Sequence, residues 1–252
     1  MGSTFAAQTA SLTTVIVEEH EQIGAPVQCT GLVHPRVVEM AQAQSSVLNN
    51  ISGFRLTFPG GRTMEVRSND TKAVVIDRGK FDRHCSERAE LEGADIITGR
   101  EFVGFQREGR KMTLTLNGPD GLEKMTADLL VGADGYKSRV GEQAGLGTAK
   151  EHIRGVQVEL DVRMEEQSLV EILVGKSVAP GFFAWILPCG DVTRVGLGVS
   201  QEGEAPNHYL NALLKKRGLD KVGRKNIISG IIPIGPPRKT YADNVLIVGD
   251  AA

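Results

Sequence analysis

Three acidic residues follow apolar runs that lie far apart in this 252-residue chain. Glu18 closes the run TTVIV, Asp134 follows LLVGA, and Asp250 follows VLIVG. A carboxylate at the end of a buried strand accepts two hydrogen bonds at once, which suits the ribose hydroxyls of a dinucleotide. Glycine in such a turn, as at Gly135, lets the backbone approach a pyrophosphate. One acid alone is explained equally well as a solvated charge or a helix cap, but three in this order favour a nucleotide site.

The elements that must position these acids alternate between strand and helix and then become rich in strands. Apolar residues spaced three to four apart predict helices, and alternating ones predict half-exposed strands. Asn207 is the predicted N-cap of the last helix, whose apolar stripe is Leu210, Leu213 and Leu214. This order predicts a mixed α/β fold, in which a nucleotide-binding domain carries an inserted antiparallel sheet domain. The predicted helices are residues 2–11, 79–92 and 207–217, and the predicted strands are 13–18, 54–58, 62–67, 73–77, 94–98, 102–107, 112–116, 129–132, 154–162, 170–174, 182–187, 194–199 and 244–248.

The nucleotide-binding domain is predicted to be discontinuous. It comprises residues 1–52, 73–150 and 236–252, and the substrate-binding sheet domain comprises 53–72 and 151–235. The chain opens in a helix with no strand before it and ends in an apolar strand, whereas domains normally begin and end in polar surface residues. We therefore expect a fragment cut at both ends, in which only Gly2 belongs to the glycine-rich loop that precedes an acid-tipped strand.

Composition and charge argue against several other classes of protein. Lys+Arg 29 against Asp+Glu 31 gives a net charge of −2, and aromatic residues are 5%, so we expect no nucleic-acid partner. Cys29, Cys85 and Cys189 form no CxxC pair, and the histidines show no metal-ligand spacing, so we expect no disulfide framework and no metal. Free thiols favour a reducing compartment, and we expect a cytoplasmic location without a membrane-spanning helix.

The ordered set of Glu18, the loop GADGYKSRV and the run VGDAA resembles the FAD-dependent oxidoreductases of the aromatic-hydroxylase fold. Two further segments resemble the geranylgeranyl reductase family within that superfamily. They are GAPVQCTG, which ends at Gly31, and FAWILP, which contains Phe183 and Trp185. Leu187 stands where the family usually has Phe, and Cys189 stands where a Lys is common. The resemblance implies a Rossmann-like FAD-binding domain.

This resemblance also implies FAD as the cofactor and assigns residues to it. Glu18 is expected on the adenosine ribose, Asp134 with Gly135 in the pyrophosphate–ribose motif, and Asp250 on the ribityl phosphate side. The other implied contacts are Gly2 in the phosphate loop, Arg78 against the FAD, Val103 near the adenine through its backbone, and Cys29, Thr30 and Gly31 beside the flavin ring.

The activity implied by the resemblance is reduction of carbon–carbon double bonds in geranylgeranyl chains, on archaeal-type membrane lipids or prenyl diphosphates. An isolated alkene has no oxygen to polarise, so hydride delivery needs a positioned proton donor. Cys29 is the candidate, because a free thiol is ordinarily protonated at neutral pH; the alternative is a small residue that merely fits the turn. Strand alternation places Phe183 and Trp185 on one sheet face and Phe182 on the other. The first two are candidates for lining a prenyl channel, with a plain core role as the alternative.

Two other functions stay open. One is a flavin monooxygenase or halogenase that acts on a small aromatic compound, and the other is a truncated, non-catalytic piece. The electron donor is a partner that no motif identifies. Peripheral membrane contact through the basic end of helix 207–217 is a further alternative to an ordinary helix end.

Overall fold

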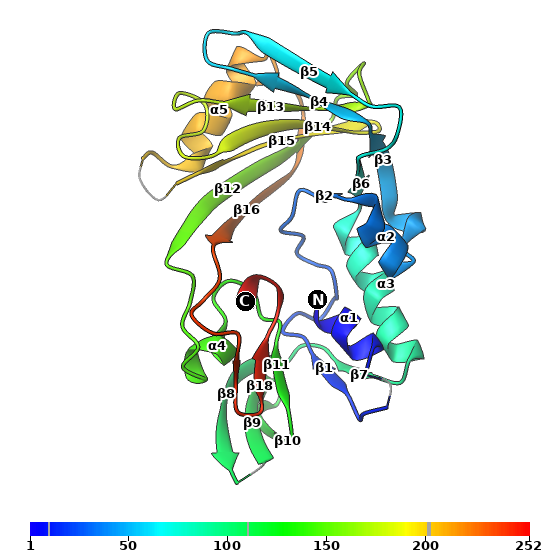
Figure 1. The fold of residues 1–252 in the computed structure, drawn as a ribbon, viewed down its shortest axis with the longest axis vertical. Helices are drawn as coiled ribbons and strands as arrows, with labels where there is room; N and C mark the ends of the chain where they lie inside the picture. Colours follow the sequence, from blue (N-terminus) through cyan, green and yellow to red (C-terminus); the bar gives the residue numbers. More distant parts are fainter. Residues whose placement is uncertain (10, 110, 201–202) are drawn as a thin grey trace. The chain divides into compact units, whose positions relative to one another are not determined.

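Residues 1–9, 11–109, 111–200 and 203–252 are described by a computed structural model (Figure 1). The chain divides into two compact units. Unit 1 comprises residues 1–26, 82–151 and 233–252, and unit 2 comprises residues 27–81 and 152–232. Within the described ranges, each helix is too short or too polar to cross a bilayer.

Unit 1 contains the strands that lead to Glu18, Asp134 and Asp250. β1 pairs with β7 and β11 pairs with β18, both in parallel, and β8, β9 and β10 form an antiparallel sheet. Apolar side chains of β9 and β18 join in one core cluster, and α1 packs on β1 through alanines and Ile16. The elements are α1 (Gly2–Ala7), β1 (Val15–Val17), β7 (Asp95–Ile97), β8 (Glu101–Glu108), β9 (Lys111–Gly118), β10 (Gly121–Ala127), β11 (Leu130–Gly132), α4 (Arg139–Gln143), β17 (Tyr241–Ala242), β18 (Val245–Ile247) and η2 (Gly249–Ala251); α3 (Arg78–Leu91) begins in unit 2 and continues into unit 1.

Unit 2 is built on a seven-stranded sheet in the order β16-β12-β15-β14-β13-β4-β5. Helix α5 covers one face, where Leu210, Leu213 and Leu214 are buried against the strands (Figure 1). A small sheet, β2-β6-β3, packs on the opposite face, where Ile51 and Val75 join Leu187 in a second cluster. The elements are β2 (Leu32–Val33), α2 (Pro35–Ala41), η1 (Gln44–Ser46), β3 (Val47–Ile51), β4 (Gly53–Thr57), β5 (Thr63–Arg67), β6 (Ala73–Ile76), β12 (Glu151–Leu160), β13 (Leu169–Val174), β14 (Phe183–Cys189), β15 (Val192–Val199), α5 (Pro206–Lys216) and β16 (Arg224–Ile234).

The mixed α/β class and most predicted elements are confirmed. The two hairpins are β4–β5 and β8–β9, and helix 79–92 is α3. The N-cap Asn207 is wrong, because α5 begins at Pro206 after Ala205, and a proline at the first helical position has no N–H to leave unpaired. The predicted elements did not include β2, β10 and β16. β2 has only two residues, and the residues of β10 and β16 are exposed or half-buried.

Residues 27–52 and 73–81 lie in unit 2, whereas the sequence places them in the nucleotide-binding domain. Their strands β2, β3 and β6 pair antiparallel with one another and pack on the large sheet. These segments lie close to Glu18 in the sequence, but their packing on the large sheet depends on residues much later in the chain. The functional assignment of each unit remains a prediction.

The close approach of β4 and β5 at Gly53 predicts a stability defect. A Cβ at Gly53 would meet the carbonyl oxygen of Val66 at 2.1 Å and Leu169 at 2.9 Å. Because backbone cannot move aside cheaply, Gly53→Ala should lower the free energy of unfolding by about 1–3 kcal/mol. Urea unfolding measures this change in free energy. It can be followed by the fluorescence of Trp185, the single tryptophan, which lies in the same sheet as Gly53.

Gly155→Ala is the matched control, because a Cβ there would lie 3.6 Å from the Gly230 carbonyl oxygen, an ordinary contact. Its stability should be unchanged or slightly raised. Equal unfolding midpoints for the two variants would contradict the β4–β5 register.

Candidate functional site

Three glycine-containing segments of unit 1 meet at the start of α1. A Cβ added to Gly2 would lie 3.3 Å from the Ala133 Cβ, and one added to Gly249 would lie 3.1 Å from Met1 Cγ. The loop after β11 and the turn after β18 therefore both approach the first residues of α1. These loops carry Asp134 and Asp250, and both residues are exposed. The structure thus brings the first residues of α1 close to both acid-bearing loops.

Asp134 organises the loop in which it lies. Its two carboxylate oxygens accept hydrogen bonds from Ser138 Oγ at 2.6 Å and from the Val140 N–H at 3.1 Å. Ser138 in turn accepts from the Gly141 N–H at 2.9 Å and is the N-cap of α4. The carboxylate therefore holds the GADG turn in shape, which leaves Gly135 exposed enough for a ligand to approach its backbone.

Glu18 lies just after β1, and its backbone is held by the last residue of β7 and by Arg100 before β8. Its N–H donates to the Ile97 carbonyl at 2.9 Å, and its carbonyl accepts from the Arg100 N–H at 3.0 Å. Oε1 accepts from the His20 N–H at 2.9 Å and lies 2.6 Å from His20 Nδ1. Among the described residues, Oε2 has no hydrogen-bond partner, so it is available to a ligand hydroxyl.

Glu18 is connected to the two acid-bearing loops through α1. This helix packs on Ile16 of β1 through its alanines, and its first residues meet Ala133. In the described part of the chain, Glu18, Asp134 and Asp250 form no hydrogen bond with one another. Val103 lies on the edge strand β8, and its carbonyl accepts from Gln143 Nε2 at 2.9 Å.

In unit 2, the tight turn that contains Cys29 lies against the end of β6 through Gly31. Gly31 has φ +77 and donates its N–H to Cys29 Sγ at 3.4 Å, and its carbonyl accepts from the Ile76 N–H at 2.8 Å. Only glycine fits, because a Cβ would lie 2.6 Å from the Ile76 carbonyl oxygen. Arg194 Nη1 donates to the carbonyl of Thr30 at 2.8 Å. Cys29 and Thr30 are half-buried.

Arg78 is half-buried and is the first residue of α3, which follows β6. Thus Cys29, Thr30 and Gly31 belong to unit 2, as does Arg78. Sequence reasoning missed Arg194, since an arginine in an alternating strand reads as a solvent-facing residue.

The face of the large sheet opposite α5 carries an aromatic patch, defined here as Phe182, Phe183 and Trp185. Trp185 donates its Nε1–H to Gln157 at 2.8 Å, and a Cβ at Gly196 would lie 2.5 Å from its ring. The ring centroids of Phe182 and Phe183 are 4.2 Å apart, and those of Phe183 and Trp185 are 6.1 Å apart. The indole therefore packs closely against a glycine and is held by a buried amide.

The predicted alternation is right for Phe183 and Trp185, because Ala184 between them is buried against the α5 side. It is wrong for Phe182. That residue precedes β14, so it is outside the pleat, and its ring lies 2.7 Å from where a Cβ of Gly198 would stand. Since Gly198 and Gly196 point to the same face, all three rings lie on the Trp185 side.

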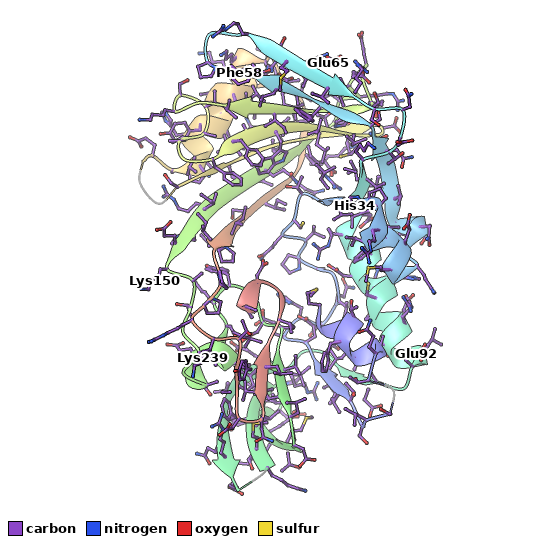
Figure 2. The ribbon with its side chains drawn as sticks, viewed as in Figure 1. His34, Phe58, Glu65, Glu92, Lys150 and Lys239 are labelled. Atoms are coloured by element: carbon purple, nitrogen blue, oxygen red, sulfur yellow. The ribbon has the colours of Figure 1, made fainter. Side chains whose placement is uncertain are left out.

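Cys189 and His34 have structural roles or environments in unit 2. Cys189 is 6% exposed, and burial raises the pKa of its thiol to about 11. His34 is the N-cap of α2, where Nδ1 accepts from the Arg36 N–H at 3.2 Å (Figure 2). In the described part of the chain, His, Cys, Asp and Glu form no group that could hold a metal ion.

Comparisons with known proteins connect this geometry to a family. Residues 9–232 match the FAD binding domain family. A digeranylgeranylglycerophospholipid reductase of Methanocaldococcus jannaschii is 30% identical over 95% of this chain and 64% of its own length. A reductase of the same name from Methanothrix thermoacetophila is 30% identical over 100% of this chain and 68% of its own length. This chain therefore spans about two thirds of the length of these relatives.

Two solved structures share the fold. A geranylgeranyl bacteriochlorophyll reductase-like protein of Thermoplasma acidophilum superposes with a TM-score of 0.89 at 24% identity, over 100% of this chain and 68% of that one. Aklavinone-11 hydroxylase, solved with FAD and aklavinone, gives 0.75 at 19% identity, over 100% of this chain and 54% of that one.

The surroundings of the cysteines predict a difference in thiol reactivity. With a pKa of about 11, about one Cys189 in a thousand is thiolate at pH 8, and its burial also blocks reagents. Iodoacetamide at pH 8 should therefore modify half-buried Cys29 in the native protein and modify Cys189 only in urea. Peptide mass spectrometry over time measures the alkylation rate at each cysteine. Equal alkylation rates of Cys29 and Cys189 in the native protein would contradict the burial of Cys189.

Proposed function

Because this chain belongs to the FAD binding domain family and, within it, to the geranylgeranyl reductases, we propose that it reduces carbon–carbon double bonds of prenyl chains with bound FAD. One observation within unit 2 carries this proposal. The Cys29 turn and the aromatic patch share one sheet face, because Arg194, which binds the turn, and Gly196, which underlies Trp185, are alternate residues of β15.

The residues of unit 1 fit the nucleotide half of FAD. Glu18 offers a free carboxylate oxygen at a strand end, and the first residues of α1 approach the loops that carry Asp134 and Asp250. We propose that these residues bind the adenosine and phosphate groups, with Gly135, and with Val103 near the adenine. Arg78, Cys29, Thr30 and Gly31 would contact the flavin side. Once bound and reduced by the electron donor, FAD would supply the hydride.

The aromatic patch suits a substrate that has no polar group along its chain. Each buried methylene contributes about 0.8 kcal/mol, so a long apolar chain gains affinity from an apolar surface alone. Trp185 and Phe183 supply that surface and exclude water, and Gln157 holds the indole in one orientation. The Cys29 thiol would donate a proton to one carbon of the double bond as hydride reaches the other.

The electron donor and the location of the substrate complete the proposal. A separate donor must return electrons to the flavin after each turnover. If the substrate is a membrane lipid, the protein meets it from the aqueous side, in a cytoplasmic location. We propose that exposed Lys215 and Lys216 at the end of α5 then face the lipid headgroups, while Arg217 pairs with Glu171.

Prenyl reduction is tested with the purified protein, FAD, dithionite as reductant and a geranylgeranyl lipid. We expect products that gain two hydrogens for each double bond reduced. Cys29→Ala should lower kcat by about a hundredfold or more, as loss of a general acid does, with flavin content unchanged. Cys85→Ala, on helix α3, is the matched cysteine control and should keep the wild-type kcat.

Oxygen-dependent hydroxylation or halogenation of an aromatic compound, with no hydrogenation of the lipid, would identify a monooxygenase or halogenase instead. Absence of flavin binding would leave the non-catalytic alternative. Wild-type kcat in Cys29→Ala would remove this thiol from the chemistry.

The ribose assignment predicts weaker FAD binding when Glu18 is truncated. Hydrogen bonds to a charged group contribute about 1.5–3 kcal/mol, so Glu18→Ala should raise the Kd for FAD about ten- to a hundredfold. Flavin fluorescence titration measures this change. Glu19→Ala, at the more exposed neighbouring position, should leave the Kd unchanged, and equal Kd values for the two variants would refute the assignment.

A further inference from the structure

Arg194 reaches from the large sheet to the backbone of the Cys29 turn, and we propose that it is a positioning residue that determines where the Cys29 thiol lies. This inference rests on the proposed function for its chemical meaning. The contact itself joins residues that are 164 positions apart in the chain.

A single guanidinium nitrogen ties together two separate segments. Arg194 Nη1 donates to the carbonyl of Thr30 at 2.8 Å and to the carbonyl of Ile76 at 3.2 Å. The first carbonyl belongs to the turn and the second to the end of β6. Arg194 therefore fixes the turn against a strand that is itself packed in the core of unit 2.

Glu159 holds the guanidinium in this position. Its Oε2 accepts from Arg194 Nε at 3.2 Å, and the two residues are direct partners on the paired strands β12 and β15. The side chains are only 13% and 18% exposed. Glu159 Oε1 also accepts from Asn226 Nδ2 at 3.3 Å, so the carboxylate is itself anchored. A half-buried, fixed ion pair keeps a planar donor group in one orientation.

The turn has little freedom to adjust around this group. A Cβ at Gly31 would lie 2.6 Å from the Ile76 carbonyl oxygen and 2.9 Å from Arg194 Nη1. The Gly31 N–H also donates to Cys29 Sγ. Because the guanidinium binds the carbonyl between these two residues, its loss releases the peptide that orients the thiol.

Cys29 reactivity tests the inference without any flavin or substrate. In Arg194→Met, we expect the rate of Cys29 alkylation by iodoacetamide to rise about threefold or more, because the released turn exposes the thiol. Cys189 in the same molecule reports unfolding, so its labelling should stay negligible. Arg163→Met is the matched control, since Arg163 forms an exposed ion pair with Asp191, and it should leave the Cys29 rate unchanged.

Arg194→Lys and Glu159→Gln decide the matter if Arg194→Met fails to fold. Lysine keeps the charge but lacks the fork that reaches Glu159 and the carbonyls together, so it should give an intermediate rate. A Cys29 rate equal to wild type in these folded variants would overturn the inference. A rise of Cys29 and Cys189 labelling in parallel would also overturn it, because the role of Arg194 would then be general stability.

Turnover provides a second readout that separates this inference from the proposed function. If the protein reduces prenyl chains, Arg194→Lys should lower kcat while KM for the lipid stays at the wild-type value, since the aromatic patch is intact. If the protein shows no reductase activity, the proposed function fails, and the Cys29 alkylation rates still decide whether Arg194 positions the turn.

Discussion

The Arg194 guanidinium joins the Cys29 turn to the open face of the seven-stranded sheet, and the proposed substrate site depends on that junction. The sheet has two different faces. One is sealed by α5, while the other is covered in part by the small sheet and leaves Trp185 and Phe183 half-buried. The ion pair of Arg194 with Glu159 holds the guanidinium that binds the polar turn on this face.

Unit 1 differs from unit 2 in that it places backbone and carboxylate groups at the ends of its strands. Both carboxylate oxygens of Asp134 accept hydrogen bonds from its own loop, so the residue shapes the turn. Glu18 is held by His20 through one oxygen and keeps the other available. The residues proposed for the nucleotide half of FAD thus belong to unit 1, and those proposed for the apolar substrate belong to unit 2.

Local patterns predicted the parts of the site that depend on local sequence. The strand-then-acid runs at Glu18 and Asp134, and the alternation at Trp185, are confirmed as features of the fold. Features fixed by distant contacts were not predictable from spacing. Arg194 meets Thr30 across 164 positions, and the Phe182 ring, outside β14, lies against Gly198 of β15. The division into units likewise depends on distant contacts, since β6 packs with a sheet whose strands lie mostly much later in the chain.

Emission from Trp185 tests the central claim most directly, because it is the single tryptophan and lies on the proposed substrate face. Titration of the FAD-loaded protein with a geranylgeranyl lipid should change this emission in a saturable way, at concentrations that match the KM for reduction. Saturable reduction of the lipid with no change in Trp185 emission would contradict the account, since the prenyl chain would then bind elsewhere.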